Sequence, residues 1–350
     1  MRLGKSQGVL VATFVIASFA GWLVSLTGIP LAWMVGAMLS VIITSLSGLP
    51  AAEPYPLMPY VKASVGTLLG ATVTTAIFVA IPQWWGSLLF LLLVMAISGF
   101  LNYQVLRRLM QFDRGSAALC ATPGGITEMI ILSEQTGVDQ TRVAIVHALR
   151  IALCVLIIPI LVSATVEVNI QQDDISINKL MTLPDWGWFA LCVAASIVVN
   201  RYIKLPAGLI LVALFFCAGL HLSGVTHFQV PAYITNLIQV FIGINVGARF
   251  IGTTPKQLTY VMLAAMAVVT IQISIAYGSA MLVANYTDLN LLALILAYSP
   301  GGLAEMSMIA VAMGIEVIFI GLHHLIRVLL ALFMGPLLLS WVVESTDRQK

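Results

Sequence analysis

The sequence has too few charged residues for a protein that is surrounded by water. Of its 350 residues, 9% are charged and 60% are hydrophobic. A soluble domain carries about a quarter charged residues, because its surface must be hydrated. The shortage therefore excludes an ordinary soluble protein and indicates a polytopic membrane protein. The net charge of +2 comes without a basic run, so we expect no nucleic-acid partner.

Cysteine is scarce as well. The chain has four cysteines, all of them in apolar segments and none spaced for a metal or redox site. They are Cys120, Cys154, Cys192 and Cys217. Buried cysteines of this kind behave as small apolar side chains. We therefore expect no metal site at the cysteines. The five histidines offer no evident copper or iron cluster either, so we also expect no cofactor and no enzymatic activity.

Long apolar stretches fill most of the chain, and none of them alternates as a surface strand does. There are twelve, most of them near the roughly 20 residues that cross a bilayer as a helix. They are about 8–27, 31–49, 59–81, 85–105, 115–134, 141–166, 186–200, 205–223, 231–250, 258–284, 289–313 and 316–343. We predict an all-α polytopic fold with membrane repeats at 1–166 and 185–350 and an acidic linker at 167–184.

One segment is present twice, which is the strongest signal in the chain. Residues 123–159 and 300–336 carry the same pattern, and each matched pair is separated by 177 residues. The pattern is Pro123-Gly124-Gly125, Glu128, Gly137, His147, Arg150 and Pro159 in the first copy, and Pro300-Gly301-Gly302, Glu305, Gly314, His324, Arg327 and Pro336 in the second. Weaker matches pair Gly48 with Gly224 and Gly70 with Gly243. Two long apolar repeats are typical of transporters.

The distribution of basic residues indicates that the two repeats are inverted relative to each other. In the first half they precede the first apolar segment and follow the fourth, whereas in the second half they follow the first and third. These residues are Arg2, Lys5, Arg107, Arg108, Arg114, Arg201, Lys204, Arg249 and Lys256. Because basic loops stay in the cytoplasm, inversion with a cytoplasmic N-terminus places all of them on one side. Both termini are then cytoplasmic.

Inversion requires an odd number of crossings in each half, and six apolar segments are an even number. The Pro-Gly-Gly segment is the best candidate for one that does not cross, because proline removes a backbone donor and glycine is a poor helix former. Each half is therefore predicted to have five crossings plus a broken or re-entrant Pro-Gly-Gly helix. The alternative is twelve full crossings with parallel repeats.

A helix that is broken inside a membrane exposes unpaired N–H groups at one end, which attract anions, and C=O groups at the other, which attract cations. Glycine also lets the backbone approach a ligand closely. We therefore predict a substrate site on the two breaks, although a kinked helix packed against a neighbour is the structural alternative. The predicted substrate-binding residues are Thr122, Pro123, Gly124, Gly125, Arg150, Ser299, Pro300, Gly301, Gly302, Arg327 and Asn245.

Each repeat also sets three ionisable side chains in apolar sequence. The two arginines are predicted either to bind an anionic substrate or to pair with the glutamates, because Arg stays charged and needs a partner at membrane depth. The glutamates couple protons or form those ion pairs, and the histidines pack in a polar interior or relay protons. Proton coupling or gating is accordingly predicted for Glu128, His147, Glu305 and His324.

The duplicated Pro-Gly-Gly-x-x-Glu-Met motif, followed by His-x-x-Arg, resembles the AbrB family of bacterial inner-membrane proteins. The resemblance covers essentially the whole chain and implies a multi-pass protein of the bacterial inner membrane. Family names refer to transcriptional regulation and to ammonia monooxygenase. The family also looks like a distant relative of the cation/proton antiporter and anion transporter group, which uses inverted repeats with broken helices.

These observations together predict a secondary transporter for a small solute, with an organic anion favoured and proton coupling as one option. The predicted site lies between the two Pro-Gly-Gly breaks. The expected partners are the solute and the lipid bilayer, and a homodimer is one possible assembly. The alternative is a membrane-embedded regulator or sensor that acts on gene expression indirectly.

Overall fold

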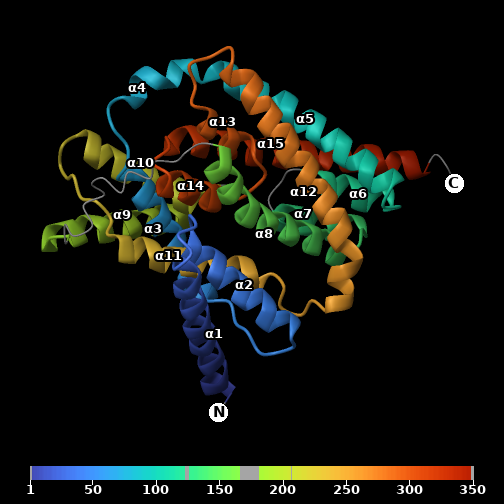
Figure 1. The fold of residues 1–350 in the computed structure, drawn as a ribbon, viewed down its shortest axis with the longest axis horizontal. Coiled ribbons are helices and arrows are strands. Elements are labelled where there is room, and N and C mark those ends of the chain that lie inside the picture. Colours follow the sequence, from blue (N-terminus) through green and yellow to red (C-terminus); the bar gives the residue numbers. More distant parts are fainter. Residues whose placement is uncertain (1, 123–125, 166–180, 206, 348–350) are drawn as a thin grey trace. The chain divides into compact units, whose positions relative to one another are not determined.

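The computed structural model describes residues 2–122, 126–165, 181–205 and 207–347. In this part of the chain there are fifteen α-helices, two single 3-10 turns (η1, Tyr55–Leu57; η2, Ile81–Gln83) and no strand, which confirms the all-α prediction (Figure 1). Five helices are long and apolar enough to cross a bilayer, in agreement with a polytopic membrane protein. They are Gln7–Ser25, Trp85–Arg108, Gln140–Leu161, Leu183–Tyr202 and Val261–Ala284.

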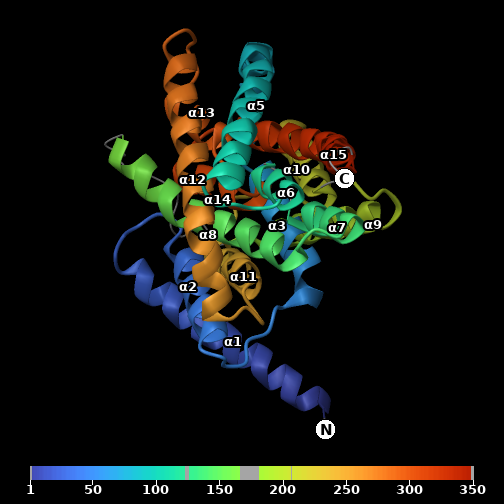
Figure 2. The ribbon, with the colours of Figure 1, turned by 90° about the vertical axis from the view of Figure 1, so that its right-hand side faces the viewer.

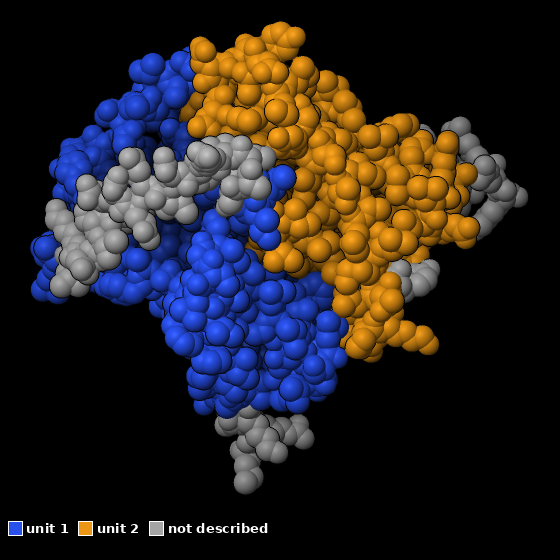
Figure 3. Space-filling model, viewed as in Figure 1, with its two compact units in different colours: residues 1–83, 159–252, 303–321 blue, residues 84–158, 253–302, 322–350 orange. Residues whose placement is uncertain are grey.

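The helices form two compact units, which Figure 3 shows in different colours. Unit 1 comprises residues 1–83, 159–252 and 303–321, and unit 2 comprises residues 84–158, 253–302 and 322–350. Each unit therefore contains segments of both sequence repeats. Residues 166–180, which make up most of the predicted acidic linker, lie outside the described residues.

Unit 1 contains mainly the first three long helices of each repeat. Its helices are α1 (Arg2–Ser25), α2 (Ala32–Leu46), α3 (Met58–Gly70), α4 (Ile77–Ala80), α9 (Leu183–Tyr202), α10 (Gly208–Leu222), α11 (Ala232–Ala248) and α14 (Leu303–Ala312). Unit 2 contains most of the remainder. Its helices are α5 (Trp85–Arg108), α6 (Arg114–Ala121), α7 (Ile126–Thr136), α12 (Pro255–Ala284), α13 (Leu291–Tyr298) and the larger parts of α8 (Gln140–Thr165) and α15 (Val317–Asp347).

Several helices are shorter than the apolar stretches that contain them. Helices α2, α3, α10 and α11 have 13 to 17 residues, which corresponds to about 20–26 Å at 1.5 Å per residue. The apolar stretches 115–134 and 289–313 each contain two helices. The prediction of near-20-residue helices is therefore wrong for α2, α3, α10 and α11, because turns between apolar residues leave hydropathy unchanged. The stretches 115–134 and 289–313 are those for which a broken helix was predicted.

The helices of unit 1 pack reciprocally between the repeats. Helix α3 of the first repeat lies against α10 of the second, and α11 of the second lies against α2 of the first (Figures 1 and 2). Likewise, α1 contacts α2 and α11, while α9 contacts α10 and α3. Each contact thus has a counterpart with the repeats exchanged, which is the pattern of an isologous two-fold interface.

Glycines make these close approaches possible. A Cβ on Gly66 would overlap the carbonyl oxygen of Ile210, and a Cβ on Gly243 would overlap that of Met34. Gly70 and Gly247, one turn further along, face the same two helices. Small residues at such positions allow helices to pack backbone against backbone.

These contacts correct one sequence match. The structural counterpart of Gly243 is Gly66 and not Gly70, because the partners Ile210 and Met34 are themselves equivalent positions of the two repeats. The glycine pairs are therefore separated by 177 residues, like the Pro-Gly-Gly motifs. The match of Gly48 with Gly224 stands, since both end a helix with positive φ, 73° and 74°.

Candidate functional site

Two short helices of unit 2, α6 and α13, begin and end at equivalent residues of the two repeats. Each starts with a side-chain cap. Asp113 accepts a hydrogen bond from the Ser116 N–H at 2.8 Å, and Asn290 accepts one from the Leu292 N–H at 2.8 Å. Such caps satisfy N–H groups that have no partner inside the helix. The sequence thus starts both helices at the same register.

Both helices stop where the backbone becomes extended. The residue after α6 is Thr122, with ψ 126°, and the residue after α13 is Ser299, with ψ 143°. A proline follows each of them, and an extended conformation is the one that a residue before proline prefers. We call residues 122–125 the first break and residues 299–302 the second break. Pro123, Gly124 and Gly125 lie outside the described residues.

A second pair of short helices, α7 and α14, follows the breaks and also matches between the repeats. Gly137 after α7 has φ 69°, and Gly314 after α14 has φ 64°. The residue after each glycine donates back into the last turn, Val138 N–H to Ser133 O at 3.1 Å and Ile315 N–H to Ala310 O at 2.9 Å. This is the usual glycine-terminated helix end, and it explains why a glycine stands at both positions.

A buried histidine holds the last turn of each first half-helix. His147 Nε2 lies 3.0 Å from Leu119 O, and His324 Nε2 lies 3.0 Å from Leu296 O. A carbonyl oxygen can only accept, so Nε2 carries the proton and donates in both cases. Both imidazoles are fully buried. They satisfy carbonyl groups that have no partner inside the helix.

A buried arginine binds the carbonyl group at the start of each break. Arg150 donates from Nη1 to Thr122 O at 3.1 Å, and Arg327 donates from Nη1 to Ser299 O at 2.5 Å. Arg327 also donates to Gly301 O and to His324 Nδ1. Both arginine residues are at most 5% exposed. The guanidinium groups therefore act on the negative end of a helix dipole.

Binding to backbone carbonyl groups is a role that neither of the two predictions for the arginines included. The signal was present, because a helix that stops inside apolar sequence leaves carbonyl groups in need of donors. A five-donor side chain in a neighbouring helix could have been matched to them.

The remaining predicted residues are distributed between the units. Asn245 lies in α11 of unit 1, where its side-chain amide donates to Glu53 at 2.6 Å. Glu305 is buried in α14, also in unit 1, and has no ion-pair partner there among the described residues. Pro300, Gly301 and Gly302 belong to unit 2 with the second break. The side chain of Glu128 lies outside the described part of the chain.

A buried hydrogen-bond network lies next to the second break and was not predicted from the sequence. His323 Nε2 lies 2.9 Å from Ser87 Oγ, which lies 2.8 Å from the Tyr298 hydroxyl. Tyr298 also donates to Ser87 O at 3.2 Å. All three residues are buried. The repeat-one counterpart of His323 is Val146, so comparing the repeats gave this histidine no support.

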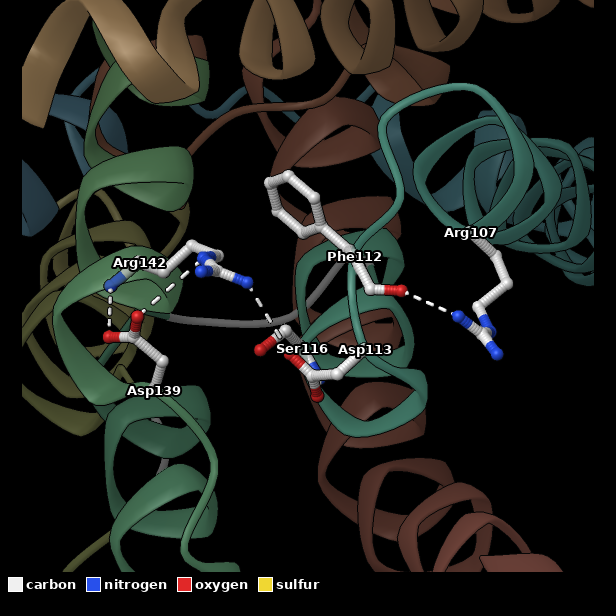
Figure 4. Close-up of polar contacts among 6 residues, drawn as sticks. All are labelled: Arg107, Phe112, Asp113, Ser116, Asp139 and Arg142. Carbon is white, nitrogen blue, oxygen red and sulfur yellow. Dashed lines mark hydrogen bonds and ion pairs between the residues drawn. The ribbon is translucent and has the colours of Figure 1, made fainter.

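An ion-pair cluster is specific to the first repeat. Arg142 contacts Asp113 at 3.4 Å and Asp139 at 3.6 Å, and its guanidinium lies 4.9 Å from the centre of the Phe112 ring. Figure 4 shows these side chains at the starts of α6 and α8, with Arg107 bound to Phe112 O. The counterpart of Arg142 is Phe319. The cluster therefore links the starts of α6 and α8 in the first repeat through charges that Phe319 does not supply in the second.

No group of three or more His, Cys, Asp or Glu side chains suited to a metal ion occurs among the described residues. What the arrangement does provide is chemistry for anions and protons. Each break combines a guanidinium, an imidazole and backbone polar groups inside apolar sequence. Ionisable groups of this kind are rare in apolar membrane segments.

The family model described as "Transition state regulatory protein AbrB" matches residues 33–343 of the chain. The chain belongs to the AbrB family. It is 25% identical to "Uncharacterized protein YhjN" of Bacillus subtilis (strain 168), over 92% of this chain and 90% of that one. It is 23% identical to "Putative regulator AbrB" of Escherichia coli (strain K12), over 92% of each chain. No solved structure matches this AbrB-family protein.

Proposed function

We propose that this AbrB-family protein is a secondary transporter of a small solute, most favourably an organic anion, which binds between the two breaks. One observation carries the proposal. In each repeat a buried arginine donates to the carbonyl group that ends a half-helix, with the same geometry twice. Ionisable side chains and interrupted helices are costly in a membrane, and duplicated interrupted helices are the usual means of building a transport site at mid-depth.

The proposed topology has two inverted repeats, each with five crossings and one broken or re-entrant helix. The reciprocal packing of α3 on α10 and of α11 on α2 supports a two-fold relation between the repeats. The basic loops support an axis in the plane of the membrane, because only inversion keeps them all in the cytoplasm. The protein then resides in the bacterial inner membrane with both termini in the cytoplasm.

The preference for an anion follows from electrostatics. Arg150 and Arg327 add positive charge beside the breaks, and the helices that follow each break, α7 and α14, begin with N–H groups that attract anions. Proton coupling would use Glu128 and Glu305, with the two buried histidines as further candidates. A carboxylate that binds a proton in one conformation and releases it in another can drive such a cycle.

Flux through proteoliposomes tests the proposal. The purified protein is reconstituted and screened for uptake of radiolabelled succinate, lactate, benzoate and amino acids, with and without a pH gradient. We expect uptake of at least one acid, and we expect Arg327→Ala to abolish it. Arg201→Ala is the matched control, because Arg201 is an exposed cation at the end of α9. Absence of flux and of binding for every small acid and amine would remove the support for transport.

The second candidate is a membrane-embedded regulator, and the family description and the name of the Escherichia coli relative favour it. A regulator needs surface for partners outside the membrane. The described loops are short, and the one between α5 and α6 has only residues 109–113. Transcript profiles of a deletion strain that carries Arg150→Ala distinguish the two. A regulator retains its effect on expression when transport is lost, whereas a transporter does not.

A further inference from the structure

The hydroxyl groups at the two breaks are in different states. At the first break, Thr122 Oγ1 donates to Ala118 O at 2.8 Å, so the hydroxyl is used within its own helix. At the equivalent position of the second break, Ser299 Oγ is fully buried and has no hydrogen-bond partner in the part of the chain that the structure describes. A buried hydroxyl without a partner costs about 1–3 kcal/mol and calls for an explanation.

The side chains next to Ser299 are held rigidly. Tyr298 immediately precedes it and is anchored by Ser87 of α5, which in turn bonds to His323 of α15. Three helices of unit 2 thereby fix the end of α13. The first break has no such network among the equivalent residues, since Ala121, Val146 and Ala264, the counterparts of Tyr298, His323 and Ser87, have no polar side-chain atoms. A polar group is well suited to bind a ligand when its surroundings are already fixed.

Positive charge is also fixed at the second break. Arg327 donates to Ser299 O and Gly301 O, one on each side of Pro300. His324 Nδ1 accepts from Arg327, and its Nε2–H donates to Leu296 O, so this imidazole is neutral and the guanidinium is the charged member of the pair. An anionic group close to Ser299 would thus meet a hydroxyl donor beside a fixed cation.

We infer that the two breaks are unequal and that the second one, at Ser299, binds the carboxylate of a small organic acid. The first break then has the role of a structural counterpart. The inference rests on the proposed function, because it takes this acid to be the transported solute. It goes further in assigning the ligand's charged group to one repeat and naming Ser299 as its hydrogen-bond donor.

Thiol accessibility at the matched positions tests this inference and does not require the solute to be identified. Ser299→Cys and Thr122→Cys are prepared in the full chain and reconstituted in liposomes. Each is treated with an anionic reagent, sulfonatoethyl methanethiosulfonate, and with a cationic one, trimethylammonioethyl methanethiosulfonate. Mass spectrometry gives the labelled fraction with time. The unsubstituted protein measures the background from its four native cysteines, all of which are buried.

Ser299 is as buried as the native cysteines, so a thiol at this position can react faster than theirs only if the proposed solute pathway opens to it during the transport cycle. On that basis we expect Ser299→Cys to react about tenfold faster than Thr122→Cys, and faster with the anionic reagent, because thiol reactivity follows access and positive surroundings. Equal rates at the two positions, labelling no faster than background, or a preference for the cationic reagent would overturn the inference. Each variant should elute from a size-exclusion column at the same volume as the unsubstituted protein, which verifies that it is folded. If Ser299→Cys aggregates, Gly301→Cys reports on the same break, with the same rates expected.

The outcome is separable from that of the proposed function. If no acid is transported but Ser299→Cys is labelled as expected, the inequality of the two breaks stands and the transport proposal fails. If an acid is transported but Ser299→Cys is not labelled, the assignment to the second break fails alone.

Discussion

The two repeats keep the same backbone around their breaks but surround it with different side chains. The starts of the helices around the breaks, their caps, the glycine-terminated ends, the histidine contacts and the arginine contact to the residue before proline match at a separation of 177 residues. By contrast, the first repeat carries an ion-pair cluster where α6 and α8 begin, and the second carries a buried network beside its break. The comparison teaches that the contacts to the half-helix carbonyl groups constrain both copies, whereas the neighbouring side chains have specialised.

The largest loss of stability is expected at the glycines where a helix of one repeat packs against a helix of the other in the same way twice. Gly66→Ala and Gly243→Ala would each place a Cβ against the backbone of the other repeat, and overpacking of this kind costs about 3 kcal/mol of unfolding free energy. The losses should be the same in both repeats within about 0.5 kcal/mol. SDS titration in mixed micelles measures them. Gly219→Ala is the control, because nothing lies within 4 Å of its added Cβ; an equal loss there would contradict the prediction.

Removing the arginines tests whether the two breaks depend on the same support. Arg150→Ala and Arg327→Ala each leave buried carbonyl groups without a charged donor, and we expect each to lose about 2–3 kcal/mol in the same titration. Arg327→Lys should recover less than half, because lysine lacks the planar fork that serves two carbonyl groups at once. Full recovery by lysine would show that charge alone suffices.

Removing the helix caps should cost the same stability in both repeats, and less than removing the arginines. Asp113→Ala and Asn290→Ala each remove an acceptor for a first-turn N–H group, at a cost of about 1 kcal/mol. Conservative exchanges, Asp113→Asn and Asn290→Asp, should preserve most of the stability, because both side chains cap well. A clear difference between the two Ala variants would mean that the first-repeat cap depends on its ion pair.

The smallest effect is expected where the repeats differ. Arg142 is partly exposed and its ion pairs are 3.4–3.6 Å long, so Arg142→Gln should cost about 0.5 kcal/mol or less. Raising the salt concentration should remove the difference, because exposed charges are screened. Phe319→Leu in the second repeat is the counterpart and should show no salt dependence. A salt-independent loss at Arg142 would assign the effect to packing on Phe112.

Much of the fold could be predicted because the same sequence signals occur twice. The spacing of Gly137 and His147 from their counterparts matched helix ends and backbone contacts residue for residue. The arginine partners were not predicted because a guanidinium usually pairs with a carboxylate, although the predicted helix breaks already implied carbonyl groups in need of donors. The glycine register was missed by four residues, since two glycines one turn apart offer two matches and only contacts between distant segments decide.

Side-chain differences between the repeats could not be predicted from the duplication. His323 and Ser87 lie more than 200 positions apart, and neither has a polar counterpart in the other repeat. The state of the Ser299 hydroxyl also depends on which neighbours are within reach of its Oγ. Sequence shows that Ser and Thr occupy equivalent positions, but only the structure shows that one of them is already bonded.

The glycine faces of α3 and α11 have a consequence for how the protein is made. Helix α3 is synthesised long before α10, the helix against which it packs. Helix α10 is made only when the ribosome has translated well into the second half of the mRNA. Until then, the glycine face of α3 lacks its partner helix, and the first half alone contains no helix that takes the place of α10. Two separately expressed halves should accumulate only when both are produced in the same cell.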